Sequence, residues 1–323
     1  MNNVPLTRKD FTNDNDVRWC PGCGDYAILA ALQKVLPEMG LPPEKHVFVS
    51  GIGCAGRLPY YMNTYGLHTI HGRATAVATG LKAMHDDLCV WVITGDGDAL
   101  SIGGNHLIHC LRRNVDLNIL LINNQVYGLT KGQFSPTSRS GQITKTSPQG
   151  VNSQPMNPIA LALSAGATFV ARAVDKDPKQ LGEILKLAAD HKGISFVEIY
   201  QDCHIFNHGA FDAFTQKAHR SEHTIELKSG EPLYFGSEQE WILEFNQGQW
   251  QKRDHKNANG YCHNSADFIA AMRLAQLSFP DFPVPLGVYY QADREVFSFK
   301  SKMNKKVQDL QALYRTKASW RQD

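Results

Sequence analysis

Two apolar, β-rich runs joined by one helix-length segment limit most strongly how this chain can fold. Residues 88–94 and 117–122 each have the pattern of a buried strand, and residues 101–114 between them have helical apolar spacing. Strands joined in this way run parallel, so their carboxyl ends reach the same edge of a sheet. We therefore expect an α/β fold, a mostly parallel sheet with helices on both faces, whose ligands bind at that edge.

Polar residues follow both strands at this edge. Asp96 follows the first strand within a GDGD turn, and Asn124 follows the second within an asparagine pair. Mg²⁺ prefers hard oxygen ligands and often shares them with phosphate oxygens. Asp96 offers a carboxylate, Asn124 an amide oxygen, and the main-chain carbonyl of Val126 could add a third ligand. The glycines of the turn let the main chain approach a phosphate, and the helix start that follows favours negative charge. The pattern predicts a magnesium diphosphate site.

The same segment resembles the thiamine diphosphate motif, which begins GDG and ends NN after roughly 25 intervening residues. Gly97 and Asn123 have that separation here. Either half alone is often an ordinary turn or loop. Both halves, correctly spaced and each after a buried strand, indicate a thiamine diphosphate-binding fold.

Composition and charge exclude several classes of protein. The 323 residues suffice for one large α/β domain and an appendage, and the net charge of +2 argues against bulk binding to nucleic acid or a membrane. No stretch approaches the roughly 20 apolar residues of a membrane span, and the polar N-terminus has no apolar signal core. We expect a cytoplasmic protein whose seven cysteines serve metal or redox chemistry.

Four cysteines lie near the expected ligand-binding edge. Cys20 and Cys23 form a CPGC turn before an apolar helix, whereas Cys54 and Cys203 each come soon after an expected strand. Four soft ligands suit Zn²⁺ or a [4Fe–4S] cluster. Structural zinc normally uses two close pairs, and an electron carrier makes chemical sense beside a thiamine site, but the spacing alone leaves both metals open.

The remaining cysteines have a different interpretation. Cys89 lies inside an expected buried strand and Cys110 inside an expected helix, so we interpret both as packing residues. Cys262 lies in a polar C-terminal region and has no evident partner.

Several stretches together resemble the β subunit of 2-oxoacid:ferredoxin oxidoreductases, especially the two-subunit 2-oxoglutarate type. They are WCPGCGDYAIL, SGIGCAGR, LHTIHGRATAVATGLK, GDGDALSIGGNH, LLINNQVYGLTKGQFSPTS, the region of Cys203, and SFPDFPVPLGVYYQADREVF. The resemblance implies oxidative decarboxylation of a 2-oxo acid with coenzyme A, here 2-oxoglutarate to succinyl-CoA and CO₂ or the reverse. Electrons would pass to ferredoxin, with thiamine diphosphate, Mg²⁺ and one [4Fe–4S] cluster as cofactors.

The resemblance also implies roles for individual residues. It implies cluster ligands at Cys20, Cys23, Cys54 and Cys203. It implies Mg²⁺ ligands at Asp96, Asn124 and the carbonyl of Val126. Residues expected along the thiamine cofactor are Ile52, Gly53, His71, Gly97, Asp98, Gly128, Leu129 and Thr130.

Lys131 is a candidate contact for the substrate. It lies in the loop that leaves the metal site, and loops at strand ends are well placed to line a pocket. 2-Oxoglutarate keeps a distal carboxylate, which an ammonium on a flexible stem can reach. In related sequences the lysine of YGLTKGQ goes with 2-oxoglutarate use, so we assign Lys131 to that carboxylate. The other interpretation is a solvated side chain.

The chain lacks one part that thiamine chemistry needs. A glutamate must contact the aminopyrimidine ring, yet none occurs between Glu44 and Glu183, and Glu198 lies on an expected strand and is a poor candidate. Thiamine enzymes also use two α/β domains, whereas this chain shows one set of units. We expect a partner α subunit to supply the glutamate and the second domain, and the resemblance implies two α and two β chains.

The sequence pattern divides the chain into three parts. Residues 1–18 are a polar lead-in, residues 19–220 form the expected cofactor-binding domain, and residues 221–323 form a C-terminal segment expected to contact another subunit. The tail over residues 298–323 has the spacing of an amphipathic helix with a basic face. It is either a solvated surface helix or a contact for a partner subunit or an acidic ferredoxin.

Three other functions stay open at this point. The chain could belong to a pyruvate or broad-specificity enzyme of the same family, or to a nonoxidative thiamine enzyme with structural zinc. It could also be a non-enzymatic Cys₄ metal-binding scaffold. A cluster gives visible absorption that dithionite bleaches, whereas a zinc protein is colourless.

Overall fold

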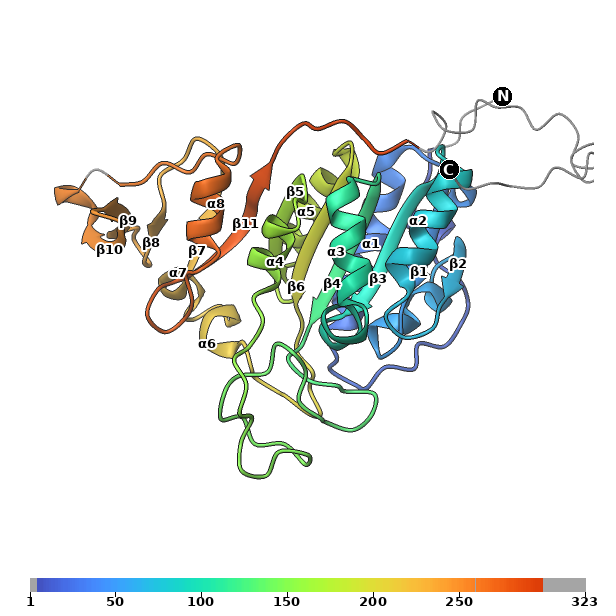
Figure 1. Ribbon diagram of the computed structural model, residues 1–323, viewed down its shortest axis with the longest axis horizontal. Helices are drawn as coiled ribbons and strands as arrows, with labels where there is room; N and C mark the ends of the chain where they lie inside the picture. Colours follow the sequence, from blue (N-terminus) through green and yellow to red (C-terminus); the bar gives the residue numbers. More distant parts are fainter. Residues whose placement is uncertain (1–4, 259, 299–323) are drawn as a thin grey trace, which may run out of the picture.

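The computed structural model, which describes residues 5–258 and 260–298, is built on an eight-stranded sheet (Figure 1). In spatial order its strands are β2 (Tyr65–His68), β1 (His46–Ser50), β3 (Cys89–Gly95), β4 (Leu117–Asn123), β6 (Ile194–Tyr200), β5 (Phe169–Val174), β11 (Val284–Gln291) and β7 (Thr224–Leu227). Every neighbouring pair from β2 to β5 is parallel, while β11 is antiparallel to β5 and parallel to β7. The expected mostly parallel sheet is confirmed.

Helices cover both faces of this sheet (Figure 1). One face carries α2 (Ala74–Met84), α3 (Gly104–Arg113), α4 (Pro158–Ser164) and α8 (Phe268–Leu274). The other carries α1 (Asp25–Val35) and α5 (Pro178–Asp190). The short helices α6 (Asp212–Thr215) and α7 (Arg220–His223) follow β6. Among the described residues no helix is long and apolar enough to cross a membrane.

The central strands β3 and β4 are mostly apolar, and both of their faces are buried. Along β4, Ile119 and Leu121 pack into the core beneath α2, α3 and α4, whereas Leu120 and Ile122 pack into the core beneath α1 and α5. Parallel strands covered on both faces have continuous apolar runs rather than alternating ones. This is why the two runs of the central unit are recognisable in the sequence.

Local capping explains where the later helices begin. Asp177 accepts hydrogen bonds from the N–H groups of Lys179 and Gln180, and Pro178 occupies the first helical position, where no N–H is needed. Asn157 and Pro158 start α4 in the same way. The helix expected from residue 101 differs, because a π-helical turn (Asp98–Ile102) precedes α3.

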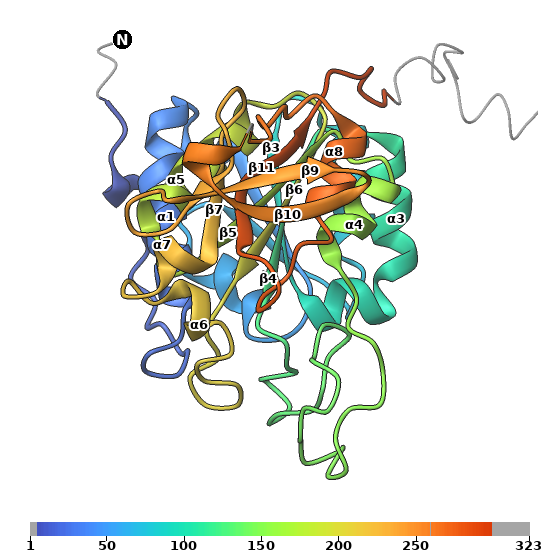
Figure 2. The same ribbon diagram turned by 90° about the vertical axis from the view of Figure 1, so that its left-hand side faces the viewer.

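The segment after residue 220 continues the main sheet. It supplies β7 and β11, and Ile225 and Leu227 share a core with Val170 and Phe196. An expected domain boundary at residue 220 therefore falls within one sheet; β7 is too short to stand out as a strand in the sequence. The same segment forms a small antiparallel sheet at one end of the molecule (Figure 2). Its strands are β8 (Tyr234–Phe235), β9 (Trp241–Asn246) and β10 (Gln249–Asp254).

Short 3-10 helices complete the fold. They span Arg8–Phe11, Leu36–Met39, Pro43–Lys45, Ala55–Tyr61 and His255–Asn257. The helix expected over residues 298–323 lies outside the described residues, apart from residue 298.

Candidate thiamine diphosphate and metal site

Two adjoining cavities lie at the carboxyl ends of β1, β3, β4 and β6. The first, of about 110 Å³, is lined by all three predicted Mg²⁺ ligands and all eight predicted cofactor contacts: Asp96, Asn124, Val126, Ile52, Gly53, His71, Gly97, Asp98, Gly128, Leu129 and Thr130. The second, of about 190 Å³, is lined by the four predicted cluster ligands: Cys20, Cys23, Cys54 and Cys203. Cys54, Asn124, Gly128 and Leu129 line both cavities.

Asp96 is buried and held by two hydroxyl groups from the long loop after β4. Its Oδ2 accepts hydrogen bonds from Ser135 at 2.5 Å and from Thr137 at 2.6 Å. Burial raises the pKa of the Asp96 carboxyl to about 6, and the two hydroxyl donors offset part of that rise. The two hydroxyl groups therefore fix the orientation of the carboxylate, while burial makes its charged form costly. A bound cation would offset that cost.

Asn123, the last residue of β4, and Asn124, which follows it, have different side-chain partners, because successive residues of an extended chain point to opposite sides. The Asn124 side chain lines the first cavity, with its amide nitrogen donating to Gln201 Oε1 at 3.0 Å. The Asn123 amide instead donates to the buried Glu198 at 2.7 Å. Of the NN pair, Asn124 is thus the one available to a ligand.

Asp98 organises the glycine-rich turns around the first cavity. Its carboxylate accepts hydrogen bonds from the main-chain N–H groups of Ile52 at 3.1 Å and Gly72 at 2.7 Å, and lies 2.5 Å from His71 Nδ1. A Cβ on Gly51 would lie 1.7 Å from the same carboxylate, so only glycine permits this approach. The Asp98 carboxylate is thus committed to joining three segments that line the cavity.

The loop that lines the first cavity also packs against the thiols. A Cβ on Gly128 would lie 3.4 Å from Cys203 Sγ and 3.7 Å from Cys54 Sγ. All seven cysteines of the chain are free thiols. Burial raises the pKa of Cys54 to about 12 and also raises the pKa values of Cys23 and Cys203. Four thiols that line one cavity are a donor set for a soft metal or an iron–sulfur cluster.

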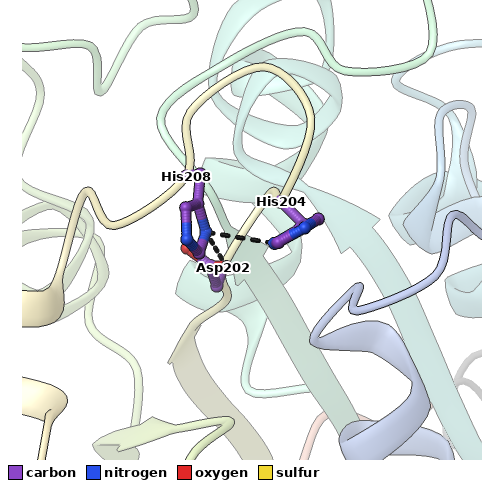
Figure 3. A group of neighbouring side chains, drawn as sticks. All are labelled: Asp202, His204 and His208. Carbon is purple, nitrogen blue, oxygen red and sulfur yellow. Dashed lines mark hydrogen bonds and ion pairs between the residues drawn. The ribbon is translucent and has the colours of Figure 1, made fainter.

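The segment after β6 holds Cys203 through a turn centred on Asp202 (Figure 3). Asp202 accepts from the N–H of Gly209 at 2.8 Å and lies 2.9 Å from His208 Nδ1, and His208 lies 3.2 Å from His204. The ligand atoms of these three side chains lie within 4.8 Å of one another. These hydrogen bonds account for their spacing, and the group's main effect is to shape the turn that carries Cys203.

Lys131 lies at the rim of the thiol cavity rather than in the cavity of Asp96. It is exposed, and its N–H donates to the carbonyl of Gly128 at 3.0 Å. Its φ of 78° is in the left-handed region that favours glycine. A non-glycine residue in this conformation costs about 1–3 kcal/mol of main-chain strain.

An open groove of about 850 Å³ leads to both cavities. It shares Ile52, Gly53 and Leu129 with the first cavity, and Leu129 also lines the second. Arg18 and Arg57, two further residues of the groove, also line the thiol cavity. Asp14 and Asp16 line the same groove, and Asp16 pairs with Arg18 at 3.0 Å, so the groove carries charges of both signs.

Glu198 is buried and fully engaged. One carboxylate oxygen accepts from Arg172 Nε at 2.7 Å and the other from Asn123 at 2.7 Å. It does not line the first cavity, and none of the described residues that do is a glutamate.

Sequence reasoning missed four residues that support the site. Ser135 and Thr137 hold Asp96, while Gln201 and Asn207 contact Asn124. The FSPTS run in an otherwise irregular loop was the one available signal, because small hydroxyl residues between two buried elements are candidates for satisfying a buried carboxylate. Gln201 and Asn207 flank Cys203, and nothing in their local pattern marks them.

Comparison with known proteins agrees with this geometry. The family model for the thiamine pyrophosphate enzyme C-terminal TPP binding domain matches residues 51–199. The chain is 59% identical over 239 residues to the KorB subunit of a 2-oxoglutarate oxidoreductase from Mycobacterium tuberculosis, covering 74% of this chain and 64% of the relative. It is 50% identical over 189 residues to the β subunit of 2-oxoacid:ferredoxin oxidoreductase 1 from Aeropyrum pernix, covering 58% and 59%.

A solved structure is similar along nearly the whole chain. It is the 2-oxoglutarate:ferredoxin oxidoreductase from Magnetococcus marinus with 2-oxoglutarate, coenzyme A and succinyl-CoA bound. The TM-score is 0.79 at 33% identity, over 99% of this chain and 98% of that chain. The matches to the curated relatives, by contrast, cover less than two thirds of those relatives' length.

Fold and cavity together define a thiamine diphosphate-binding domain of the α/β type. The chain belongs to the family of 2-oxoacid:ferredoxin oxidoreductase β subunits.

Proposed function

We propose that this chain is the cofactor-binding β subunit of a 2-oxoglutarate:ferredoxin oxidoreductase. The reaction is the coenzyme A-dependent oxidative decarboxylation of 2-oxoglutarate to succinyl-CoA and CO₂, or its reverse, in the cytoplasm. The observation that carries the proposal is the adjacency of the two cavities. Residues of a diphosphate and Mg²⁺ site line one, four thiols line the other, and four residues line both. Chemistry on thiamine can then pass electrons to a cluster without an intervening domain.

The first cavity fits Mg²⁺ and the diphosphate of thiamine diphosphate. Asp96, Asn124 and the carbonyl of Val126 would hold the metal. In the described part of the chain, the side chains that donate hydrogen bonds to the buried Asp96 are hydroxyl groups, and both donate to its Oδ2. Bound thiamine diphosphate would supply the carbanion and the electron sink that decarboxylation of a 2-oxo acid requires. The residues of this chain orient that cofactor, and His71, fixed by Asp98, lines the cavity beside it.

The second cavity fits one [4Fe–4S] cluster held by Cys20, Cys23, Cys54 and Cys203. The thiols converge from three separate segments and are partly shielded from water, which suits a cluster that exchanges single electrons with ferredoxin. Zinc would leave the electrons of the reaction without an acceptor in this chain.

A partner α subunit is part of this proposal. No glutamate among the described residues lines the first cavity, and Glu198 is engaged with Arg172 and Asn123. The aminopyrimidine ring needs such a group, so the α subunit would supply it across the interface.

The substrate is the remaining question. We assign the distal carboxylate of 2-oxoglutarate to Lys131, an exposed residue with a left-handed main chain that lines the thiol cavity. Arg57 in the groove also lines the thiol cavity and would contact an anionic molecule there, whereas Arg18 is paired with Asp16.

The test is to co-purify the chain with its α subunit and assay several 2-oxo acids with coenzyme A and a viologen dye. We expect 2-oxoglutarate to give the highest kcat/KM and pyruvate a much lower one. A colourless complex that lacks iron, or one without dye reduction by any 2-oxo acid, would overturn the proposal. Preference for pyruvate would overturn the substrate assignment alone.

A further inference from the structure

Gln201 contacts both cavities through one side chain. It follows β6, is 1% exposed, and lines the thiol cavity. Its Oε1 accepts a hydrogen bond from Asn124 at 3.0 Å, while its Nε2 lies 3.3 Å from Cys23 Sγ. A predicted magnesium ligand and a predicted cluster ligand are thus joined by a single buried amide.

The orientation of this amide follows from its third contact. Gln201 Nε2 donates to the main-chain carbonyl of Asp202 at 2.6 Å, and a carbonyl oxygen can only accept. The nitrogen must therefore lie on the side of Asp202 and Cys23, and the oxygen on the side of Asn124. A flipped amide, with its nitrogen and oxygen interchanged, would lose at least one of these hydrogen bonds.

The fixed amide of Gln201 helps to orient Asn124. Because Gln201 presents an acceptor, Asn124 must present its amide nitrogen to it. The Asn124 Oδ1 lies at the other end of the amide and accepts a hydrogen bond from the Val126 N–H at 3.2 Å, which favours the same orientation. That oxygen is the atom a hard cation requires. The side-chain amide of Asn207 also holds Asn124 in place, because it donates a hydrogen bond to the Asn124 main-chain carbonyl at 2.8 Å.

The other end of Gln201 acts on a sulfur atom. An N–H donor directed at a cysteine ligand stabilises the negative charge on sulfur, and hydrogen bonds to sulfur are one of the factors that set the reduction potential of a cluster. The added electron of the reduced cluster increases that charge, so the donor favours the reduced form.

We propose that Gln201 is a positioning residue that couples the magnesium–diphosphate site to the cluster. It keeps the Asn124 oxygen toward the metal and donates an N–H···S hydrogen bond to Cys23, so that filling one site changes the properties of the other. This inference rests on the proposed function, because it takes Asn124 as a magnesium ligand and Cys23 as a cluster ligand.

The test compares three variants in the complex with the α subunit. Gln201→Met keeps the length and the burial of the side chain but removes both the amide donor and the amide acceptor. Asn207→Leu removes a side-chain contact to Asn124 but no side-chain contact to a thiol. Gln180→Met changes a similarly buried glutamine on α5, outside both cavities, and serves as the matched control.

Two readouts besides activity follow the two ends of Gln201. Calorimetry on chelator-treated complex measures the affinity for Mg²⁺ with thiamine diphosphate. A redox titration followed by electron paramagnetic resonance measures the cluster's midpoint potential, with and without that cofactor.

Gln201→Met should weaken Mg²⁺ binding roughly three- to tenfold, the equivalent of one neutral hydrogen bond. It should also make the cluster harder to reduce, by up to about tenfold in the equilibrium constant, or about 59 mV for one electron. The cofactor-induced change in midpoint potential should shrink, because coupling between two sites is reciprocal. Asn207→Leu should weaken Mg²⁺ binding without moving the potential, and Gln180→Met should change neither.

The outcomes separate this proposal from the function it rests on. Wild-type complex without iron, or without affinity for thiamine diphosphate, would contradict the proposed function. Wild-type complex with both cofactors, together with a Gln201→Met variant of unchanged Mg²⁺ affinity and unchanged potential, would overturn the coupling alone. Loss of both cofactors in Gln201→Met with the Gln180→Met control intact would also overturn it, because that result indicates a structural role only.

Discussion

The two cavities differ in how they are built and in what they contain before any metal binds. The cavity of Asp96 comes mainly from one strand–helix–strand unit, and its key carboxylate already has hydroxyl partners. The thiol cavity draws Cys20, Cys54 and Cys203 from three distant segments; Cys54 and Cys203 are half-buried and Cys20 is exposed. The first site is preorganised by hydrogen bonds, whereas the second is brought together by the fold.

The pKa values express this difference. Burial, together with the negative charge of nearby Asp25, raises the pKa of the Cys54 thiol to about 12. Without a metal Cys54 therefore stays protonated at neutral pH. A bound metal must displace this proton, so cluster assembly should be strongly pH-dependent and should add to the stability of the fold.

The largest expected effect concerns the thiols. Replacing Cys20, Cys23, Cys54 or Cys203 by serine should each abolish most of the iron content and the dye reduction of the complex, because a hard hydroxyl is a poor substitute for a thiolate. Iron analysis and visible absorption measure the result.

The other cysteines provide matched controls for this prediction. Cys110 is buried in α3, and Cys262 donates to the carbonyl of Gly230, so neither lines the thiol cavity. Serine at these positions should leave iron bound. Iron loss in Cys262→Ser together with normal iron in Cys203→Ser would show that the fourth ligand is misassigned.

The next effect concerns the preorganised site. Asp96→Ala or Asn124→Ala should abolish retention of thiamine diphosphate while leaving the fold and the iron content intact, since each change removes one oxygen ligand of Mg²⁺. Thiamine analysis of purified complex tests this. Wild-type thiamine content in either variant would contradict the assignment of that residue.

An intermediate effect is expected for the substrate. Lys131→Ala should lower kcat/KM for 2-oxoglutarate about 10- to 100-fold, the value of one charge-assisted hydrogen bond. Pyruvate lacks the distal carboxylate and should lose much less. Equal losses with both substrates would mean that Lys131 serves the cofactor or the fold instead.

The sequence was most informative where local signals coincide with buried elements. The runs at 88–94 and 117–122 became β3 and β4, and all predicted contacts to Mg²⁺ and thiamine diphosphate line one cavity. Parallel strands covered on both faces have continuous apolar runs, and glycines close to a carboxylate or a ligand leave a readable pattern.

What could not be predicted depends on contacts between distant segments. Gln201 lies 77 residues from Asn124, and Thr137 lies 41 residues from Asp96, within an irregular loop. Polar residues of this kind take their roles from the tertiary packing around them and have no periodic signature. The same holds for β7 and β11, which join the main sheet from beyond an expected domain boundary.

The smallest expected effect tests whether the loop hydroxyls preorganise Asp96. Thr137→Val keeps the shape of the side chain but removes the hydroxyl that lies 2.6 Å from Asp96 Oδ2 and 2.9 Å from Asn123 Oδ1. Affinity for Mg²⁺ with thiamine diphosphate should fall about tenfold, the low end for a hydrogen bond to a charged group, because Ser135 still donates to the same oxygen.

The pH dependence of Thr137→Val gives the sharper readout. The Asp96 pKa is about 6 because burial disfavours the charged form, and Mg²⁺ binds only that form, so affinity should fall as the pH drops below about 6. In the metal-free chain the same raised pKa contributes stability below the ordinary Asp value of 3.8 that is lost as the pH rises through about 6.

Thr137→Val removes a donor that favours the carboxylate, so the pKa of Asp96 should rise further and the pH midpoint of Mg²⁺ binding should move upward. Cys262 does not line this cavity, so Cys262→Ser should leave the midpoint unchanged. Weaker binding at every pH with an unmoved midpoint would mean that Thr137 shapes the loop without acting on the Asp96 carboxylate.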